Sequence, residues 1–281
     1  NSVFVLDGNG NSTGVLNHDL NEIADAYIDF LSGNEHQKSE YIFTIKKSEV
    51  KDHININPQH YSPKLNAALD SVLAFDNKDN WATTTVGQLE AGIRIYIGPR
   101  WNSASIKVDN PTDTSNLVPY LTANAALELR RFTVKWLDAR KANPQQRQCI
   151  DMLKIHEGDI LISRSGTIGK VTYATKDLAE NYIVSDDLVR IRVKDANLRA
   201  YLLAYFTSST ALALMLLDEY GSVQQHLQPR HIQEMLIPVP DDWSLAQDMI
   251  DAGNMFIKAM EDMSKADRKI RTQGFDALIA E

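Results

Sequence analysis

The stretch Gly158-Asp-Ile-Leu-Ile-Ser-Arg-Ser-Gly-Thr-Ile-Gly-Lys170 constrains the fold more than any other part of this chain. It opens with a Gly-Asp turn signal, and Ile160–Ser163 is an apolar run of the length of a buried strand. Glycine accepts the positive φ of a tight reversal, so Ser165–Thr167 predicts a turn. Residues 170–174 alternate and are rich in β-formers. The stretch therefore predicts a β-hairpin.

The loop of this hairpin has two interpretations. It is either a simple connection, or a row of backbone N–H groups that faces a phosphate backbone together with polar side chains. The side chains of the second interpretation are Arg164, Ser165, Thr167 and Lys170. A nucleotide P-loop is excluded, because the strand–loop–helix context and the terminal Lys-Ser/Thr pair are missing.

Three further blocks follow the hairpin in order: Ile183–Asp186, Tyr220–Pro229 and Ile237–Pro240. Together with the hairpin, these blocks resemble the target-recognition domain of type I restriction–modification specificity (S) subunits. The resemblance covers roughly residues 81–240. It implies a mixed α/β (α+β) domain that binds double-stranded DNA, reads its sequence and has no catalytic residues of its own. The target bases cannot be decoded from the sequence.

Two residues of the second block are candidate DNA contacts. Gln224 can form a bidentate hydrogen-bonded pair with adenine. In the family that this chain resembles, the block usually has an architectural role, so both roles stay open. His226 is either a contact to DNA or a structural histidine.

The distribution of charge agrees with DNA binding in one part of the chain. The net charge is −8, but residues 1–80 carry −6, residues 81–240 carry +2 and residues 241–281 carry −4. Residues 128–147 contain six basic residues and two acidic ones, Glu128 and Asp138, which gives a local net charge of +4. The bases are Arg130, Arg131, Lys135, Arg140, Lys141 and Arg147. They predict contacts to phosphates; the alternative is a solvated basic helix face.

Residues 1–80 have a different character. A short strand at residues 3–6 precedes a helix whose apolar face runs from Leu20 to Leu31, with Gly33 as its stop. Extended segments are expected at residues 41–45 and 54–61. The segment resembles the tail of adenine-N6 DNA methyltransferase (M) subunits, which contain an Asn-Pro-x-x-Tyr sequence, here at residues 57–61. This resemblance implies the C-terminal portion of a fused methyltransferase–specificity polypeptide.

We expect no catalytic residues, no metal site and no cofactor. Adenine-N6 methyltransferases hold the flipped base with an Asn/Asp-Pro-Pro-Tyr/Phe motif. Asn57, Asn110 and Asn143 each precede a single proline and no aromatic residue. A site for S-adenosylmethionine is therefore not expected. The seven histidines show no spacing typical of metal ligands.

The C-terminal region predicts one long helix. Apolar residues advance by 4, 3, 4, 3 from residue 245 to residue 270, which is a heptad pattern. The seam consists of Leu245, Met249, Ala252, Phe256, Ala259, Met263, Ala266 and Ile270. Ser244 is the expected N-cap. The resemblance implies a coiled-coil spacer. The helix can pair with a second copy in a homodimer, pair with the Leu20–Leu31 helix, or pack on its own domain.

These features predict three parts: residues 1–80, the recognition domain at 81–240 and the helix at 241–281. The single Cys149 fits a reducing cytoplasm. Residues 200–217 carry no charge but contain a Thr/Ser cluster at their centre, so two buried helices broken there are expected rather than a membrane span. The expected partners are DNA, an adenine-N6 methyltransferase subunit or domain, and a restriction subunit. A single-chain methyltransferase or restriction enzyme and a protein-interaction scaffold are the alternatives.

Overall fold

The computed structural model describes residues 4–6, 12–16, 20–34, 63–89, 92–128, 134–216 and 226–273. The chain forms two compact units, residues 1–66 and residues 67–281. The expected bounds at residues 80 and 240 stay a prediction, and the residues on both sides of each bound belong to the larger unit. Near the start of the larger unit, the Thr83 amide donates to the Asp76 carboxylate at 2.6 Å, and the Thr83 hydroxyl donates to the Val72 carbonyl at 3.1 Å.

The smaller unit contains a hairpin and a helix. β1 (Phe4–Leu6) pairs antiparallel with β2 (Ser12–Leu16), and α1 (Leu20–Leu31) follows. Gly33 has a φ of 73°, which is typical of the residue that ends a helix. The predicted first strand, helix and stop are therefore confirmed. The extended segments predicted between residues 41 and 61 lie outside the described residues.

The larger unit mixes short strands with helices, as the fold class predicted. Its first part comprises α2 (Pro63–Leu73, which spans the boundary), η3 (Ala74–Asn77), β3 (Trp81–Thr85), η4 (Val86–Gln88), β4 (Arg94–Ile97), η5 (Ala104–Ile106), β5 (Lys107–Val108), β6 (Val118–Leu121), α3 (Ala123–Leu127), β7 (Lys135–Leu137) and η6 (Ala139–Lys141). Its second part comprises α4 (Pro144–Met152), β8 (Ile160–Ser163), β9 (Val171–Tyr173), α5 (Lys176–Asn181), β10 (Ile183–Val184), β11 (Leu188–Arg192), α6 (Ala196–Thr207), α7 (Ser209–Met215), α8 (Pro229–Glu234), β12 (Leu236–Pro240), η8 (Trp243–Ala246) and α9 (Gln247–Gln273).

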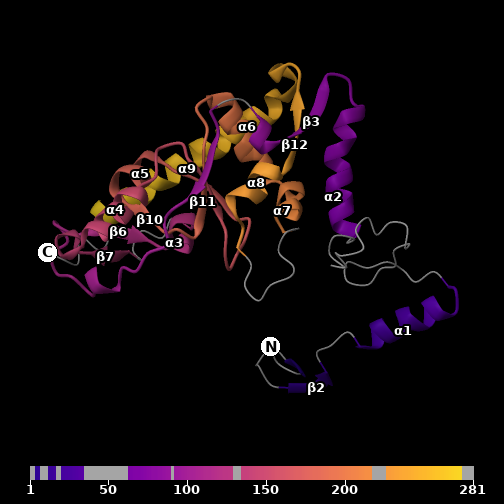
Figure 1. Cartoon of the computed structure of the whole chain (residues 1–281), viewed down its shortest axis with the longest axis horizontal. Helices are drawn as coiled ribbons and strands as arrows, with labels where there is room; N and C mark the ends of the chain where they lie inside the picture. Colours follow the sequence, from indigo (N-terminus) through magenta and orange to yellow (C-terminus); the bar gives the residue numbers. More distant parts are fainter. Residues whose placement is uncertain are drawn as a thin grey trace. The chain divides into compact units, whose positions relative to one another are not determined.

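Three sheets organise the larger unit (Figure 1). One has the order β10-β6-β7-β5, in which β10 runs parallel to β6 and the other pairs are antiparallel. The second has the order β4-β11-β8-β9 and is antiparallel throughout. The third joins β12 to β3, so the block Ile237–Pro240 forms part of a strand.

The two four-stranded sheets have separate cores that meet at β10. Val184 belongs to a buried cluster with Leu161 and Leu188 of the second sheet. Its neighbour Ile183 belongs to a cluster with Leu137 of β7 and Leu153, the residue that follows α4. Successive side chains of a strand point to opposite faces, so this two-residue strand contributes one side chain to each core.

The described part of the uncharged stretch, residues 200–216, forms two helices, as predicted; α6 is largely buried and α7 partly so. α6 ends at Thr207, and the Ser208 hydroxyl accepts from the Ala211 amide at 3.1 Å to cap α7. Burial raises the pKa of Tyr201 and Tyr205 on α6, and their hydroxyls donate to the Pro238 and Leu236 carbonyls of β12. No helix in the described part of the chain is long and apolar enough to cross a membrane.

The long C-terminal helix α9 runs along the larger unit from α6 toward α5 (Figure 1). The predicted cap is wrong by two residues. The carboxylate of Asp242, not the hydroxyl of Ser244, caps the entry by accepting from the Ser244 amide at 2.9 Å. A turn of 3₁₀ helix, η8, then leads into α9.

Candidate nucleic-acid interface

The predicted hairpin at residues 158–174 is confirmed. β8 pairs antiparallel with β9, with Ile160 opposite Tyr173 and Ile162 opposite Val171. All four residues of β8 are buried. Beyond the strands, the Gly169 amide donates to the Ser163 carbonyl at 3.1 Å and closes the loop. The loop is therefore mounted on a strand that both neighbours in the sheet hold in place.

The aspartate of the Gly-Asp signal anchors the start of this hairpin. Asp159 is fully buried, and its two carboxylate oxygens accept from the guanidinium of Arg192 at 2.8 and 3.0 Å. It also accepts from the Tyr96 hydroxyl at 3.2 Å and from the His156 amide at 3.0 Å. A bidentate charged pair is among the stronger side-chain contacts. The sequence indicated only a turn here, because Tyr96 and Arg192 are distant along the chain.

Arg164, a predicted phosphate contact, does not lie on the surface. Its side chain is buried, and its Nε donates to the Leu227 carbonyl at 3.2 Å. The Leu227 amide in turn donates to the Arg164 carbonyl at 2.9 Å. Arg164 therefore links the hairpin loop to the segment that leads into α8.

Several backbone N–H groups of the row predicted to face phosphate instead form hydrogen bonds within the loop. The amides of Thr167, Gly169 and Lys170 donate to the Ser165, Ser163 and Thr167 carbonyls. Gly169 has a φ of 82°, and an added Cβ there would come within 2.4 Å of Leu212 in α7. The loop is thus packed against α7, which restricts how another molecule can approach it.

The remaining predicted side chains of this loop reach solvent. Thr167 and Lys170 are exposed, and Ser165 is half-buried. The Lys170 ammonium lies 3.6 Å from the Glu128 carboxylate. Lys170 therefore stands at the edge of the basic segment, which begins beside Glu128.

The basic segment does not form a single helix face, as its alternative interpretation supposed. Arg130 and Arg131 lie outside the described residues. Lys135 is exposed on β7, with its ammonium 5.9 Å from the centre of the Tyr120 ring. The segment then passes through η6 into α4, so its bases are presented by a strand, a 3₁₀ turn and a helix.

Asp138 partly neutralises the basic segment. The Arg140 guanidinium donates to both Asp138 oxygens at 2.8 and 3.0 Å, and Lys141 lies 3.9 Å away. The hydrogen bonds from Arg140 lower the pKa of Asp138. The side chains of Arg140 and Lys141 are 69% and 65% exposed, so both cations face solvent although they share one carboxylate.

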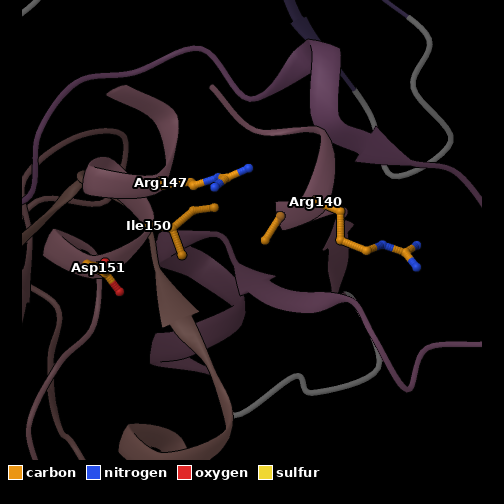
Figure 2. A pocket seen from close by; sticks show the side chains of 5 residues that line it. Arg140, Arg147, Ile150 and Asp151 are labelled. Atoms are coloured by element: carbon orange, nitrogen blue, oxygen red, sulfur yellow. The ribbon is translucent and has the colours of Figure 1, made fainter. Parts of the chain in front are cut away.

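A shallow hollow of about 530 Å³ lies between η6 and α4 (Figure 2). It is lined by Ala139, Arg140, Arg147, Ile150 and Asp151. The Arg147 Nε donates to the Ala142 carbonyl at 3.1 Å, which fixes this side chain over the hollow. Figure 2 shows Arg147 beside Ile150, whereas the guanidinium of Arg140 points away from Arg147.

The block Tyr220–Pro229 falls largely outside the described residues. Gln224 is among the residues that the structure does not describe, so its contacts stay a prediction. His226 is half-buried, and among the described residues no partner is seen for its buried Nδ1. The Nδ1 of His231 accepts from the Gln228 amide at 3.2 Å, which gives that histidine a structural role at the start of α8.

The heptad seam of α9 is exposed rather than packed on its own domain. The side chains of Leu245, Met249, Met263 and Ile270 are 49%, 40%, 55% and 63% exposed, and Phe256 is half-buried. The buried row is the one that lies one residue later. It consists of Ala246, Ile250, Gly253, Met260 and Ser264. The helix α9 therefore packs on its own domain through this buried row, and most of the predicted seam stays exposed to solvent.

The family model described as type I restriction modification DNA specificity domain matches residues 97–250. The match covers more than half of the chain. The chain belongs to this family. The match runs from the last residue of β4 to the first turn of α9. It includes both four-stranded sheets except for the first three residues of β4.

Several solved structures are similar to this chain. One comes from work on complex assembly and conformational transition of the type I R-M system; it is 17% identical, with a TM-score of 0.42, and the match covers 73% of this chain and 49% of that one. The S subunit from M. genitalium is 14% identical, with a TM-score of 0.41 and coverages of 69% and 44%. The HsdS subunit from Thermoanaerobacter tengcongensis is 14% identical, with a TM-score of 0.41 and coverages of 94% and 57%.

The chain therefore spans about half the length of the solved structures that it matches. No curated protein matches it significantly. Within the described ranges, no group of three or more His, Cys, Asp or Glu side chains is placed to hold a metal ion.

Proposed function

We propose that this chain reads a DNA sequence for a restriction–modification system and leaves the chemistry to partner subunits. The observation that carries the proposal is the family match over residues 97–250. The described residues of that range contain two buried cores, so the match is not confined to a short motif. Of the three parts expected from the sequence, residues 81–240 are the one with a positive charge balance, which suits a polyanionic partner.

The DNA-facing residues that we propose lie on the hairpin loop and the basic segment. Lys135, Lys141 and Lys170 are exposed cations, and Thr167 and Ser165 offer hydroxyl groups to phosphate oxygens. Arg140 can contribute to the positive potential, but it shares its charge with Asp138. Arg130, Arg131 and Gln224 remain predicted contacts.

The partners that we propose are an adenine-N6 methyltransferase subunit or domain and a restriction subunit. The support is the family's place in type I restriction–modification systems and the resemblance of residues 1–80 to a methyltransferase tail. A single-chain enzyme that carries this specificity portion at its C-terminus is the alternative. Copurification with a methyltransferase subunit supports separate subunits.

We also propose that the exposed seam of α9 pairs with the same seam of a second copy. Each apolar side chain of this size is worth about 1.5–3 kcal/mol when it is fully buried, so a continuous exposed row favours association. An apolar face of α1, where Tyr27, Ile28 and Leu31 are exposed, is the competing partner. A two-fold pair presents the same surface twice, and the combined DNA target is then palindromic.

The experiment that tests the function is a selection from random duplex DNA. The purified chain is mixed with a duplex library at low salt, and bound DNA is recovered over several rounds at rising salt. A specificity module enriches one defined sequence, since specific binding survives salt better than non-specific binding does. Recovery of unselected DNA after many rounds, or of no DNA at all, contradicts the proposal and favours a protein-interaction scaffold.

A further inference from the structure

One face of the sheet β4-β11-β8-β9 carries a row of bases that sequence patterns did not reveal. Side chains alternate along a strand, so residues 94 and 96 of β4 share a face, as do residues 190 and 192 of β11. Lys194 follows in the bend after β11, and its Cδ lies 3.9 Å from the position of a Cβ added to Gly92, which precedes β4. The register places Arg190 opposite Tyr96 and Arg192 opposite Arg94. We call this set the arginine face: Arg94, Tyr96, Arg190, Arg192 and Lys194.

Three guanidinium groups of this face surround one ring. The Cζ atoms of Arg94, Arg192 and Arg190 lie 4.8, 5.5 and 5.9 Å from the centre of the Tyr96 ring. Cations above an aromatic face are attracted by its electron density. The ring therefore holds the guanidinium groups close together despite their mutual repulsion.

The carboxylate near this face is already fully engaged. Asp159 binds Arg192 through both oxygens and also accepts from the Tyr96 hydroxyl and the His156 amide. Arg190 is buried and donates only to carbonyl oxygens, those of Met152, Val184 and Ser185. Asp159 thus forms its ion pair with Arg192, and the carboxylate of Asp186 acts on Arg190 only electrostatically.

Two cations, Arg94 and Lys194, lie at the open end of the face. Along β11 the exposure rises from the fully buried Arg190 to Arg192, which is 29% exposed, and then to the exposed Lys194. Arg94 is exposed on β4, at the edge of the sheet. Among the described residues, no carboxylate forms an ion pair with Arg94 or Lys194.

Arg94 lies directly across from Arg192 in the register. Asp159 already neutralises Arg192, so Arg94 is the cation of this strand pair whose charge is open to an added anion. A phosphodiester group fits, because a guanidinium presents its N–H groups in a fork that matches phosphate oxygens.

We propose that the open end of the arginine face, at Arg94 and Lys194, binds phosphate groups of the DNA backbone. This inference rests on the proposed function and adds to it a second contact region, separate in sequence from the bases at residues 128–147. Phosphate contacts position a protein on the duplex and carry no sequence information themselves. Arg94 and Lys194 thus act on affinity for all duplexes alike.

The test is the salt dependence of duplex binding by the full chain. Each phosphate contact contributes about 0.9 to the slope of log K against log salt. The variants Arg94→Gln and Lys194→Gln are each expected to reduce the slope by about 0.9 for specific and unrelated duplexes alike. Arg94→Lys keeps the charge and is expected to retain the slope.

Lys258→Gln is the matched control. It removes one exposed charge from α9, where Lys258 pairs with Asp262 at 2.7 Å, and the slope should not change. Far-ultraviolet circular dichroism and thermal unfolding check that each variant folds like the wild type. If the wild type binds duplex DNA and neither glutamine variant changes the slope, this inference alone is overturned. If the wild type binds no duplex, the proposed function fails with it.

Discussion

Gly253 of α9 lies directly against the main chain of Ala200 in α6. A Cβ added to Gly253 would come within 2.0 Å of the Ala200 carbonyl oxygen and within 2.5 Å of its carbonyl carbon. Ala200 is itself fully buried. The two helices therefore cross at a point where only hydrogen atoms separate their backbones, and this crossing fixes α9 on the recognition unit.

Gly253→Ala is expected to destabilise the larger unit. In an exposed helix, replacing glycine by alanine stabilises by about 1 kcal/mol. At Gly253 the new methyl group collides with backbone, and overpacking of this kind costs about 1–3 kcal/mol. Urea unfolding should show a lower midpoint. The control Asn254→Ala, at an exposed position of the same helix, should leave the midpoint almost unchanged; equal midpoints for both variants would argue against a close crossing.

Asp159→Asn is expected to weaken the fold through Arg192 and Tyr96. Removing one partner of a buried ion pair costs about 3–5 kcal/mol, and the lower end applies because the Arg192 side chain is 29% exposed. Denaturant unfolding measures the loss. A double-mutant cycle with Arg192→Gln identifies its origin: the two changes should be strongly non-additive. Additive losses would show that Asp159 stabilises the hairpin by some other contact.

The pair of Arg140 and Asp138 predicts a pH effect. Hydrogen bonds from Arg140 hold the pKa of Asp138 below its ordinary value of 3.8. A carboxyl group with a lowered pKa stabilises the folded state above the unfolded pKa, and that contribution is lost as the pH falls through the folded pKa. In Arg140→Gln, an NMR titration of Asp138 should give a pKa closer to 3.8. The control Lys154→Gln removes a base that pairs with Asp151 and should not move it.

The sequence predicted the local elements of this fold well. The hairpin at residues 160–173, the break between α6 and α7, and the long α9 all follow from residue type and spacing over short ranges. Such elements depend on nearby residues in the sequence. The Thr/Ser cluster at residues 207–210 separates α6 from α7, and in the same way Gly33 ends α1. Local preferences of this kind are visible without the tertiary structure.

Contacts between distant residues are not visible in the sequence. Arg164 looked like an exposed base, but its side chain is buried and donates to the Leu227 carbonyl, 63 residues away in sequence. The apolar pattern of α9 predicted its exposed seam but not the row, one residue later, that packs on the domain. That row contains Gly253 and Ser264, and the Ser264 hydroxyl bonds with the Thr175 hydroxyl at 3.2 Å. Small and polar residues that fit a particular neighbour carry no hydrophobic signal of their own.

The exposed seam of α9 predicts an association that a single charge can abolish. Met263 is 55% exposed within the seam, so Met263→Asp should disrupt a dimer without unfolding the chain. Phe256→Asp is less suitable, because Phe256 is half-buried in the monomer. Met255→Asp is the matched control, since Met255 is 72% exposed on the same helix but lies outside the seam. Light scattering that shows a monomer for the wild type would instead favour pairing with α1 or with a partner subunit.

The basic segment predicts a measurable dependence of DNA binding on salt. If Arg130, Arg131, Lys135 and Lys141 neutralise about four phosphates, these residues together contribute about −3.6 to the slope of log K against log salt. Replacing Arg130 and Arg131 together by alanine should make the slope shallower by about 1.8. The loss should be the same for unrelated sequences, since phosphate contacts are not base-specific. A double variant with an unchanged slope would remove these two arginines from the interface, whereas a loss confined to one sequence would place them against base edges.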